Sequence, residues 1–277
     1  MKVAFKSQEG KKQVLKYYDM LLAKGSLSYE TFMINTNYGE TFVIAKGEKQ
    51  LPPLILLHGS GINSAMWIKE MDEYAKKHRV YAIDIVGEPG KSGERQLPFV
   101  GDDFSNWLNE VFNGLSINKA SIVGISLGAW IGIKFAIKFS NKVEKLVLLC
   151  PAGIGDQRKS FVFKALFYIM LGDKGIEKLY YKVNGNKPLP EIILNYQKLI
   201  GKYFNFRKEV IPLFTDDDLL KLTMPIALFV GEKDVMFHSQ KTVNRLQRLV
   251  NNAQINLIKD EGRSLVNQGN EIREFLI

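Results

Sequence analysis

The stretch Gly124-Ile125-Ser126-Leu127-Gly128 decides how the rest of the chain is interpreted. It follows the apolar run Ala120–Val123, which suits a buried strand, and it opens the apolar segment Leu127–Phe139, which suits a buried helix. A serine between a strand and a helix needs a sharp, strained turn, and flanking glycines avoid the collisions that side chains would make there. The sequence therefore predicts a strand-to-helix turn with Ser126 at its centre.

Short apolar runs recur along the whole chain. Near the start, Tyr29–Asn35 and Glu40–Ala45 alternate around Asn37-Tyr38-Gly39, which predicts an antiparallel hairpin. The later runs are continuously apolar and are followed by helical stretches, as parallel strands covered on both faces require. We expect an α/β fold with a mostly parallel central sheet, an N-terminal antiparallel hairpin and helices on both faces. The later expected strands are Leu54–Leu57, Val80–Ile85, Ala120–Ile125, Val143–Cys150, Ile226–Val230 and Ile255–Ile258.

One connection is much longer than the others. Roughly 75 residues separate Cys150 from Ile226, several times the length of a normal crossover. They contain helical patterns at Phe161–Leu171 and Glu191–Tyr203. We expect a helical cap at residues 155–214, inserted before the last two strands of a core formed by residues 1–154 and 215–277.

Length and composition exclude several classes of protein. With 277 residues, 46% hydrophobic and 24% charged, the chain can form one large domain with an insertion, and it is too apolar for disorder. We find no apolar run of about 18 residues and no signal-peptide pattern in the Lys-rich first 25 residues. The sequence therefore predicts a soluble, cytoplasmic protein without a membrane span.

The positive charge of the chain is concentrated in one region. The formal charge is +9, and residues 156–209 alone hold 11 Lys and Arg against 5 Asp and Glu, together with ten aromatic residues. A local excess argues against nucleic-acid binding over the whole surface. Two interpretations stay open: an apolar pocket with an entrance that attracts an anionic small molecule, and a lysine-rich solvated face over packed helices.

Cysteine and histidine are scarce. The single cysteine, Cys150, excludes an internal disulfide, and we expect it to be a buried structural thiol. Three histidines give no cluster typical of a zinc or iron site. We expect no metal and no cofactor.

A second motif follows the expected strand Leu54–Leu57. In His58-Gly59-Ser60-Gly61, the loop can direct the Ser60 backbone N–H toward a carbonyl oxygen that gains negative charge, with the N–H of Leu127 as the second donor. We interpret His58 as a residue that braces this loop rather than as a base. The sequence therefore predicts an oxyanion hole formed by Ser60 and Leu127.

Four motifs in this order resemble those of the α/β-hydrolase superfamily. They are the His58-Gly59 loop, the segment from Asp84 to Ser92 (DIVGEPGKS), the serine turn at 124–128 and, after the long insertion, Gly231-Glu232-Lys233-Asp234. The resemblance extends from about Thr31 to Ile277, and it indicates the fold far more specifically than the substrate.

The resemblance implies an esterase-like serine hydrolase with a serine–acid–histidine triad in that chain order. Ser126 is the implied nucleophile and Asp234 the implied acid, with Asp156 as the alternative acid. The serine argues against haloalkane dehalogenases and epoxide hydrolases, which resemble this fold but use aspartate at that position.

The chain departs from the family pattern at the histidine. Relatives typically read Gly-His-Ser where this chain reads Gly262-Arg263-Ser264. A guanidinium stays protonated at physiological pH, so Arg263 cannot take the proton from Ser126. His238, four residues beyond Asp234, is the candidate replacement base, and an ordinary helix-start histidine is the alternative interpretation.

Two functions follow from these motifs. The first is a serine hydrolase for a carboxylic-ester or related acyl substrate, impaired because Arg263 occupies the histidine position. The second is a non-catalytic protein that binds a small anion or carboxylate, in which Arg263 forms a charge-assisted pair with Asp234 and contributes to a cationic binding site.

Overall fold

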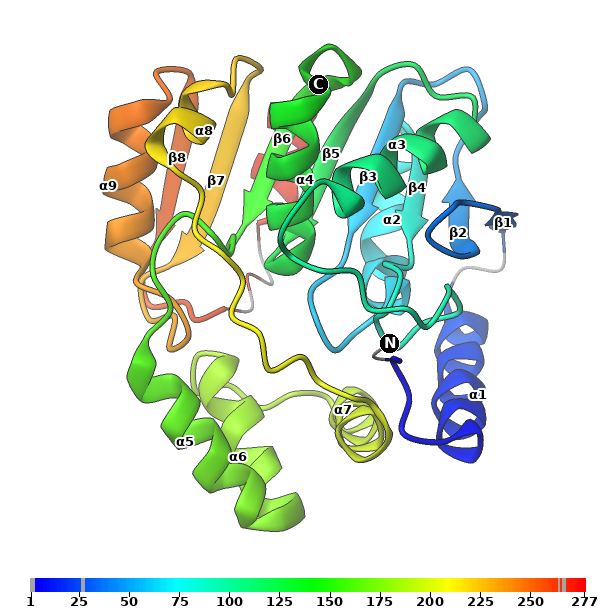
Figure 1. The fold of residues 1–277 in the computed structure, drawn as a ribbon, viewed down its shortest axis with the longest axis vertical. Coiled ribbons are helices and arrows are strands. Elements are labelled where there is room, and N and C mark those ends of the chain that lie inside the picture. The colour runs from blue at the N-terminus through cyan, green and yellow to red at the C-terminus, as the bar shows by residue number, and fades with distance from the viewer. Residues whose placement is uncertain (1–2, 26–27, 264, 266–267) are drawn as a thin grey trace.

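The computed structural model describes residues 3–25, 28–263, 265 and 268–277. Within them an eight-stranded sheet crosses the molecule in the spatial order β1-β2-β4-β3-β5-β6-β7-β8 (Figure 1). The strands are β1 (Glu30–Ile34), β2 (Thr41–Lys46), β3 (Pro53–Leu57), β4 (Arg79–Ile83), β5 (Ala120–Ile125), β6 (Val143–Leu149), β7 (Ile226–Gly231) and β8 (Ala253–Ile258).

Helices fill most of the connections between these strands. The α-helices are α1 (Gln8–Lys24), α2 (Ile68–Tyr74), α3 (Asp103–Gly114), α4 (Leu127–Lys138), α5 (Lys159–Met170), α6 (Gly172–Val183), α7 (Glu191–Tyr203), α8 (Asp216–Leu220), α9 (Ser239–Leu249) and α10 (Gly269–Leu276). Two short 3-10 helices, η1 (Ser64–Trp67) and η2 (Ser140–Lys142), precede α2 and β6.

The pairing of the strands confirms the predicted fold class. β1 and β2 form the predicted antiparallel hairpin, and β2 also runs antiparallel to β4. From β4 to β8 all neighbouring strands are parallel. The protein therefore has an α/β fold with a mostly parallel sheet and an antiparallel start.

Both faces of the sheet are covered, which explains why its central strands are continuously apolar. One buried cluster joins the sheet to α3, α4 and α9, and a second joins it to α1, α2, α7 and α10. Every residue of β7 is buried, and so is every residue of β3 except Pro53. Because neither face meets water, alternation of polar and apolar residues is absent from these strands.

The helix α1 is a feature that we did not predict from the sequence. Ser7 caps it through a hydrogen bond from Gly10 N, and Val14, Tyr18 and Leu22 form its buried stripe. The Tyr17 ring stacks on Tyr196 of α7 with the centroids 5.1 Å apart. The N-terminal segment thus contacts the part of the chain that lies between β6 and β7.

Three helices, α5, α6 and α7, occupy the long connection between β6 and β7. The sequence predicted α5 and α7 but not α6, whose first residues are rich in glycine. Gly172 has φ +65°, and a Cβ at Gly175 would collide with the backbone of Tyr168, so both glycines are needed for the tight turn from α5 to α6. In Figure 1 the three helices lie together on the side to which the arrowheads of β6 and β7 point. The extent of this cap, residues 155–214, stays a prediction.

Candidate active site

Ser126 lies at the turn between β5 and α4 in a strained backbone conformation. Its φ of 55° and ψ of −109° are rare for a residue with a side chain. Hydrogen bonds hold the turn from both sides: Ser126 N donates to Leu149 O over 3.0 Å, and Ser126 O accepts from Trp130 N over 3.1 Å. The surrounding structure therefore enforces the strain.

The glycines on either side of Ser126 are required by close approaches. A Cβ at Gly124 would lie 2.6 Å from Ala129 N, and a Cβ at Gly128 would lie 2.6 Å from His58 O. Both distances are shorter than contacts that real Cβ atoms make. The Gly-x-Ser-x-Gly pattern thus follows from the packing of α4 against β5 and against the loop after β3.

The loop after β3 lies beside Ser126. A Cβ at Gly59 would be 3.6 Å from the Ser126 Cβ atom, which is ordinary van der Waals contact. His58 is fully buried, and its Nε2 accepts from Ile85 N over 2.9 Å while Nδ1 lies 2.8 Å from Gly59 O. Because the ring accepts at Nε2, Nδ1 carries the proton and donates to Gly59 O. Burial also lowers the pKa of His58, so this side chain is a neutral brace for the loop.

Glu88 is a residue of this region to which sequence reasoning gave no role. It is 1% exposed, and its Oε2 accepts from Gly61 N over 2.7 Å and from the Ser60 hydroxyl over 3.2 Å. Burial raises its pKa to about 7. The signal that could have revealed it is an acidic residue directly before Pro89, inside the motif segment DIVGEPGKS.

Asp234 follows β7 and is 3% exposed. Its Oδ1 accepts from Met236 N over 2.7 Å and from Phe237 N over 3.2 Å. Its Oδ2 accepts from Arg263 Nη1 over 2.9 Å. Backbone donors thus fix one carboxylate oxygen, and the second binds Arg263, which stands where the resemblance implies a histidine.

Arg263 lies in the loop after β8, and its side chain is held on three sides. Nη1 donates to Asp234, and Nη2 donates to Cys150 O over 3.2 Å. The guanidinium carbon lies 4.8 Å from the centre of the Phe237 ring. Its backbone N–H donates to Val183 O at the end of α6 over 3.2 Å. The pair with Asp234 that the sequence predicted is present.

A chain of contacts joins Ser126 to this pair. Ser126 N binds Leu149 O, and the next carbonyl along the chain, Cys150 O, binds Arg263. Because β5, β6 and β7 are adjacent parallel strands, their carboxyl ends meet at one edge of the sheet. The structure therefore brings Ser126, Asp234 and Arg263 to the same edge. Leu127, the first residue of α4, is buried next to Ser126.

Cys150 is a buried thiol in this neighbourhood. Its Sγ lies 3.6 Å from Arg263 O, and burial raises the pKa of the thiol to about 11. At neutral pH the side chain is therefore uncharged, which fits the structural role expected from the sequence.

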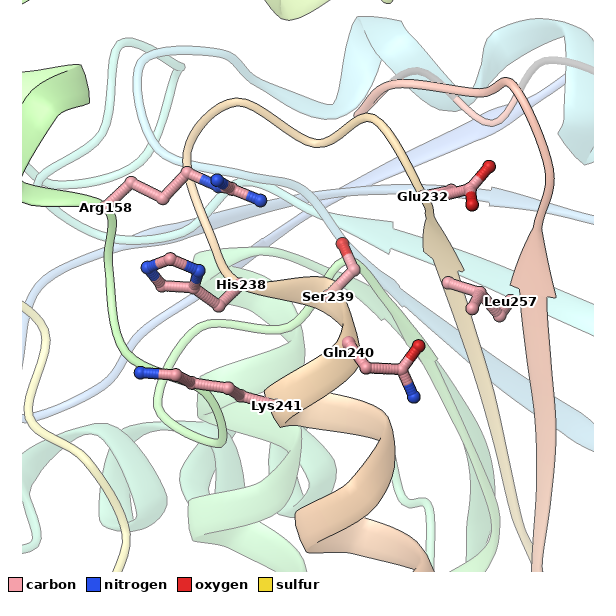
Figure 2. Close-up of a pocket in the computed structure, with 7 residues that line it drawn as sticks. All are labelled: Arg158, Glu232, His238, Ser239, Gln240, Lys241 and Leu257. Carbon is pink, nitrogen blue, oxygen red and sulfur yellow. The ribbon is translucent and has the colours of Figure 1, made fainter.

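His238 and Asp156, the alternative base and acid, contact each other. His238 precedes α9, and its Nε2 lies 4.0 Å from Asp156 Oδ2, which also accepts from Lys241 Nζ over 3.1 Å. Figure 2 shows the His238 ring between the side chains of Arg158 and Lys241, at a small pocket of ≈ 120 Å³. His238 thus pairs with Asp156 rather than with Asp234, and its role as a base stays a prediction.

Residues 3–25, 28–263, 265 and 268–277 hold neither a membrane-spanning helix nor a cluster of metal-binding side chains. In those ranges, no helix is long and apolar enough to cross a membrane. The same ranges hold no group of three or more His, Cys, Asp or Glu side chains placed to share a metal ion.

Comparison with known proteins identifies the family. Residues 52–175 match the family model described as the alpha/beta hydrolase fold. The chain is 30% identical over 256 residues to carboxylesterase YbfK of Bacillus subtilis. The aligned region covers 90% of this chain and 86% of that protein. The chain belongs to the α/β-hydrolase superfamily.

Solved structures support the same family assignment. The crystal structure of carboxylesterase CesB (YbfK) from Bacillus subtilis has a TM-score of 0.87 with 28% identity, over 97% of this chain and 98% of that one. Naproxen esterase from the same organism has a TM-score of 0.86 with 26% identity, over 98% of this chain and 100% of that one. This α/β-hydrolase is therefore esterase-like, and its relatives support a hydrolase function.

Proposed function

We propose that this α/β-hydrolase is a serine hydrolase for carboxylic esters or related acyl compounds, impaired by Arg263. Ser126 is the nucleophile, Asp234 is the acid, and the backbone N–H groups of Ser60 and Leu127 form the oxyanion hole. The observation that carries the proposal is the enforced, strained conformation of Ser126 between β5 and α4. The carboxylesterase names of the similar proteins support the substrate class.

The expected reaction follows from the geometry. The Ser126 hydroxyl attacks the ester carbonyl carbon, the alcohol leaves, and water then releases the acid from the acyl-enzyme. The developing oxyanion is stabilised by the two backbone N–H groups. Proton transfer from Ser126 is the step that fails, because Arg263 is a permanent cation and a donor only.

The pair with Asp234 supports this explanation of the impairment. In a working triad the acid orients a neutral imidazole, whereas here its free oxygen binds a guanidinium. Loss of the triad histidine costs on the order of 10⁶ in turnover, leaving what the oxyanion donors and binding supply.

The test is hydrolysis of p-nitrophenyl esters by the parent protein and its Arg263→His variant. We expect very low turnover in the parent and an increase of at least about a hundredfold in the variant, because the imidazole would regain the acid partner that Asp234 offers. Ser126→Ala in the variant background is the control and should abolish the gain. Ordinary esterase rates in the parent that depend on Ser126 would contradict the role given to Arg263.

A second candidate function is favoured by the buried cation itself. An uncleaved carboxylate ligand could bind at Ser126 through the Arg263 donors that Asp234 and Cys150 O leave available. Binding of such a ligand should weaken as the ionic strength rises past about 0.1 M if the basic charges of residues 156–209 attract it. Arg263→Ala should weaken it by about 1.5–3 kcal/mol, the contribution of a hydrogen bond to a charged group. Calorimetry with a short-chain carboxylate that shows neither effect would remove this candidate.

A further inference from the structure

A buried acid–base pair connects the loop beside Ser126 to the segment that follows α7. Glu88 comes from the connection between β4 and α3, and Arg207 comes from the segment 204–215. Arg207 Nε lies 3.9 Å from Glu88 Oε1, and the two side chains are 7% and 1% exposed. Two charged side chains are rarely this buried unless each has a partner, so the pair is a built feature of the fold.

The carboxylate of Glu88 binds the oxyanion loop through two donors. Gly61 N donates over 2.7 Å, and the Ser60 hydroxyl donates over 3.2 Å. These are successive residues, and Ser60 carries the backbone N–H that the proposed function assigns to the oxyanion hole. A carboxylate that accepts from both residues restricts rotation of the peptide planes around Ser60.

The segment 204–215 holds the other side of the same loop. Gly61 has φ +71°, and a Cβ there would lie 2.6 Å from the Phe206 ring, so glycine permits the ring to approach. The Arg207 guanidinium lies 4.7 Å from the Phe99 ring centre, and its Nη1 donates to Leu97 O over 2.6 Å. The arginine is thereby fixed in place beside Glu88.

We propose that Glu88 is a positioning residue for the oxyanion loop and that Arg207 favours the ionised form of its carboxylate. The inference rests on the function proposed for Ser60. An ionised Glu88 accepts charge-assisted hydrogen bonds from Ser60 and Gly61 at Oε2, whereas the neutral carboxyl is a weaker acceptor for both donors. The loop is therefore fixed when Glu88 is charged and loosened when it is neutral.

The balance between the two forms is set near neutral pH. Burial raises the pKa of Glu88 to about 7, against the lowering effects of the Gly61 N–H and Arg207. Arg207, from the segment after α7, is the charged group that faces Glu88, and Glu209 on the same segment acts on Arg207 in turn. Small changes in the position of Arg207 would therefore shift the protonation of Glu88.

The direct test is an NMR titration of the Ser60 and Gly61 amide resonances between pH 5 and 9. We expect both to shift with a midpoint near 7 in the parent and to lose that transition in Glu88→Gln. Arg207→Met should raise the midpoint by about 1 pH unit or more, because an opposite charge is removed, and Arg207→Lys should stay closer to the parent. Glu110→Gln, which changes a carboxylate bound to Asn37, is the matched control and should leave the transition unchanged.

Three results would overturn the inference: amides that do not titrate in the parent, the same transition in Glu88→Gln, or an unchanged midpoint in both Arg207 variants.

Activity in the Arg263→His background separates this inference from the proposed function. There Glu88→Gln should lower kcat on the order of tenfold with a smaller change in KM, and flatten the profile near pH 7. An active Arg263→His with no response to Glu88→Gln refutes the positioning role alone. If Arg263→His is inactive but the Ser60 and Gly61 amides still titrate, the proposed function is refuted. The effect of Glu88 on the loop then still holds.

Discussion

Arg263 donates from Nη1 to Asp234 Oδ2 across 2.9 Å, and the two side chains are 9% and 2% exposed. They belong to the loops after β8 and β7, so the pair joins the last two strands of the sheet at their carboxyl ends. Both charged groups are buried, and the attraction between them offsets the free-energy cost of removing each from water. The same contact therefore affects the stability of the fold and the chemistry available to Ser126.

The first prediction concerns the stability of that pair. Asp234→Ala leaves a buried guanidinium without its anion and should lower the free energy of unfolding by about 3–5 kcal/mol. Arg263→Ala should have an effect of similar size, and the double variant should lose less than the sum of the two. Urea unfolding followed by tryptophan fluorescence measures all three. Lys233→Ala, which breaks the exposed pair with Asp260, is the control and should leave the midpoint unchanged.

The second prediction concerns the reactivity of Ser126. A fluorophosphonate probe reports whether the hydroxyl is activated without requiring the correct substrate. We expect slow labelling of the parent, faster labelling of Arg263→His and none of Ser126→Ala, as measured by intact-protein mass spectrometry. Rapid stoichiometric labelling of the parent at Ser126 would instead indicate a replacement base, and His238→Ala would then have to slow it.

The elements that could be predicted from the sequence are those with a distinctive local pattern of residues. The continuously apolar runs around Ala120–Ile125 gave the parallel strands, because a strand covered on both faces needs no alternation. The turn at Ser126 was predictable since glycine on both sides has a steric cause. The helix α1 was missed although Val14, Tyr18 and Leu22 have helical spacing, because frequent lysines obscured the apolar stripe.

Contacts between distant segments were harder to predict from the sequence. The pair of Arg263 with Asp234 could be expected only through the family resemblance, which supplied the position of the missing histidine. The pair of Glu88 with Arg207 had no comparable guide, since each residue is a common surface type and neither position indicates its partner. The contact between His238 and Asp156 likewise depends on how the segment after β6 lies beside α9.

The third prediction concerns the dependence of stability on pH. Glu88 has a pKa of about 7 in the folded protein against an ordinary value of 4.5, so between these values the folded state binds a proton that the unfolded state lacks. The contribution of Glu88 to stability is therefore fully present below about pH 4.5 and is lost as the pH rises to about 7, by up to about 1.4 kcal/mol per pH unit. Glu88→Gln should remove this part of the slope in urea unfolding measured from pH 4.5 to 8. An identical slope in parent and variant would show that Glu88 titrates normally.

The fourth prediction concerns the close approach of α4 to the loop after β3. Gly128→Ala would place a Cβ 2.3 Å from Leu57 O and 2.6 Å from His58 O, and these backbone atoms cannot move freely. We expect a loss of about 1–3 kcal/mol in the free energy of unfolding from overpacking, accompanied by slower labelling of Ser126 as its turn shifts. Gly201→Ala in α7 is the matched control: nothing lies within 4 Å of its Cβ, so helix propensity should stabilise it by about 0.5–1 kcal/mol. If Gly128→Ala were as stable as the parent, the steric explanation of the Gly-x-Ser-x-Gly pattern would be wrong, because that explanation requires the helix to lie within contact distance of the loop.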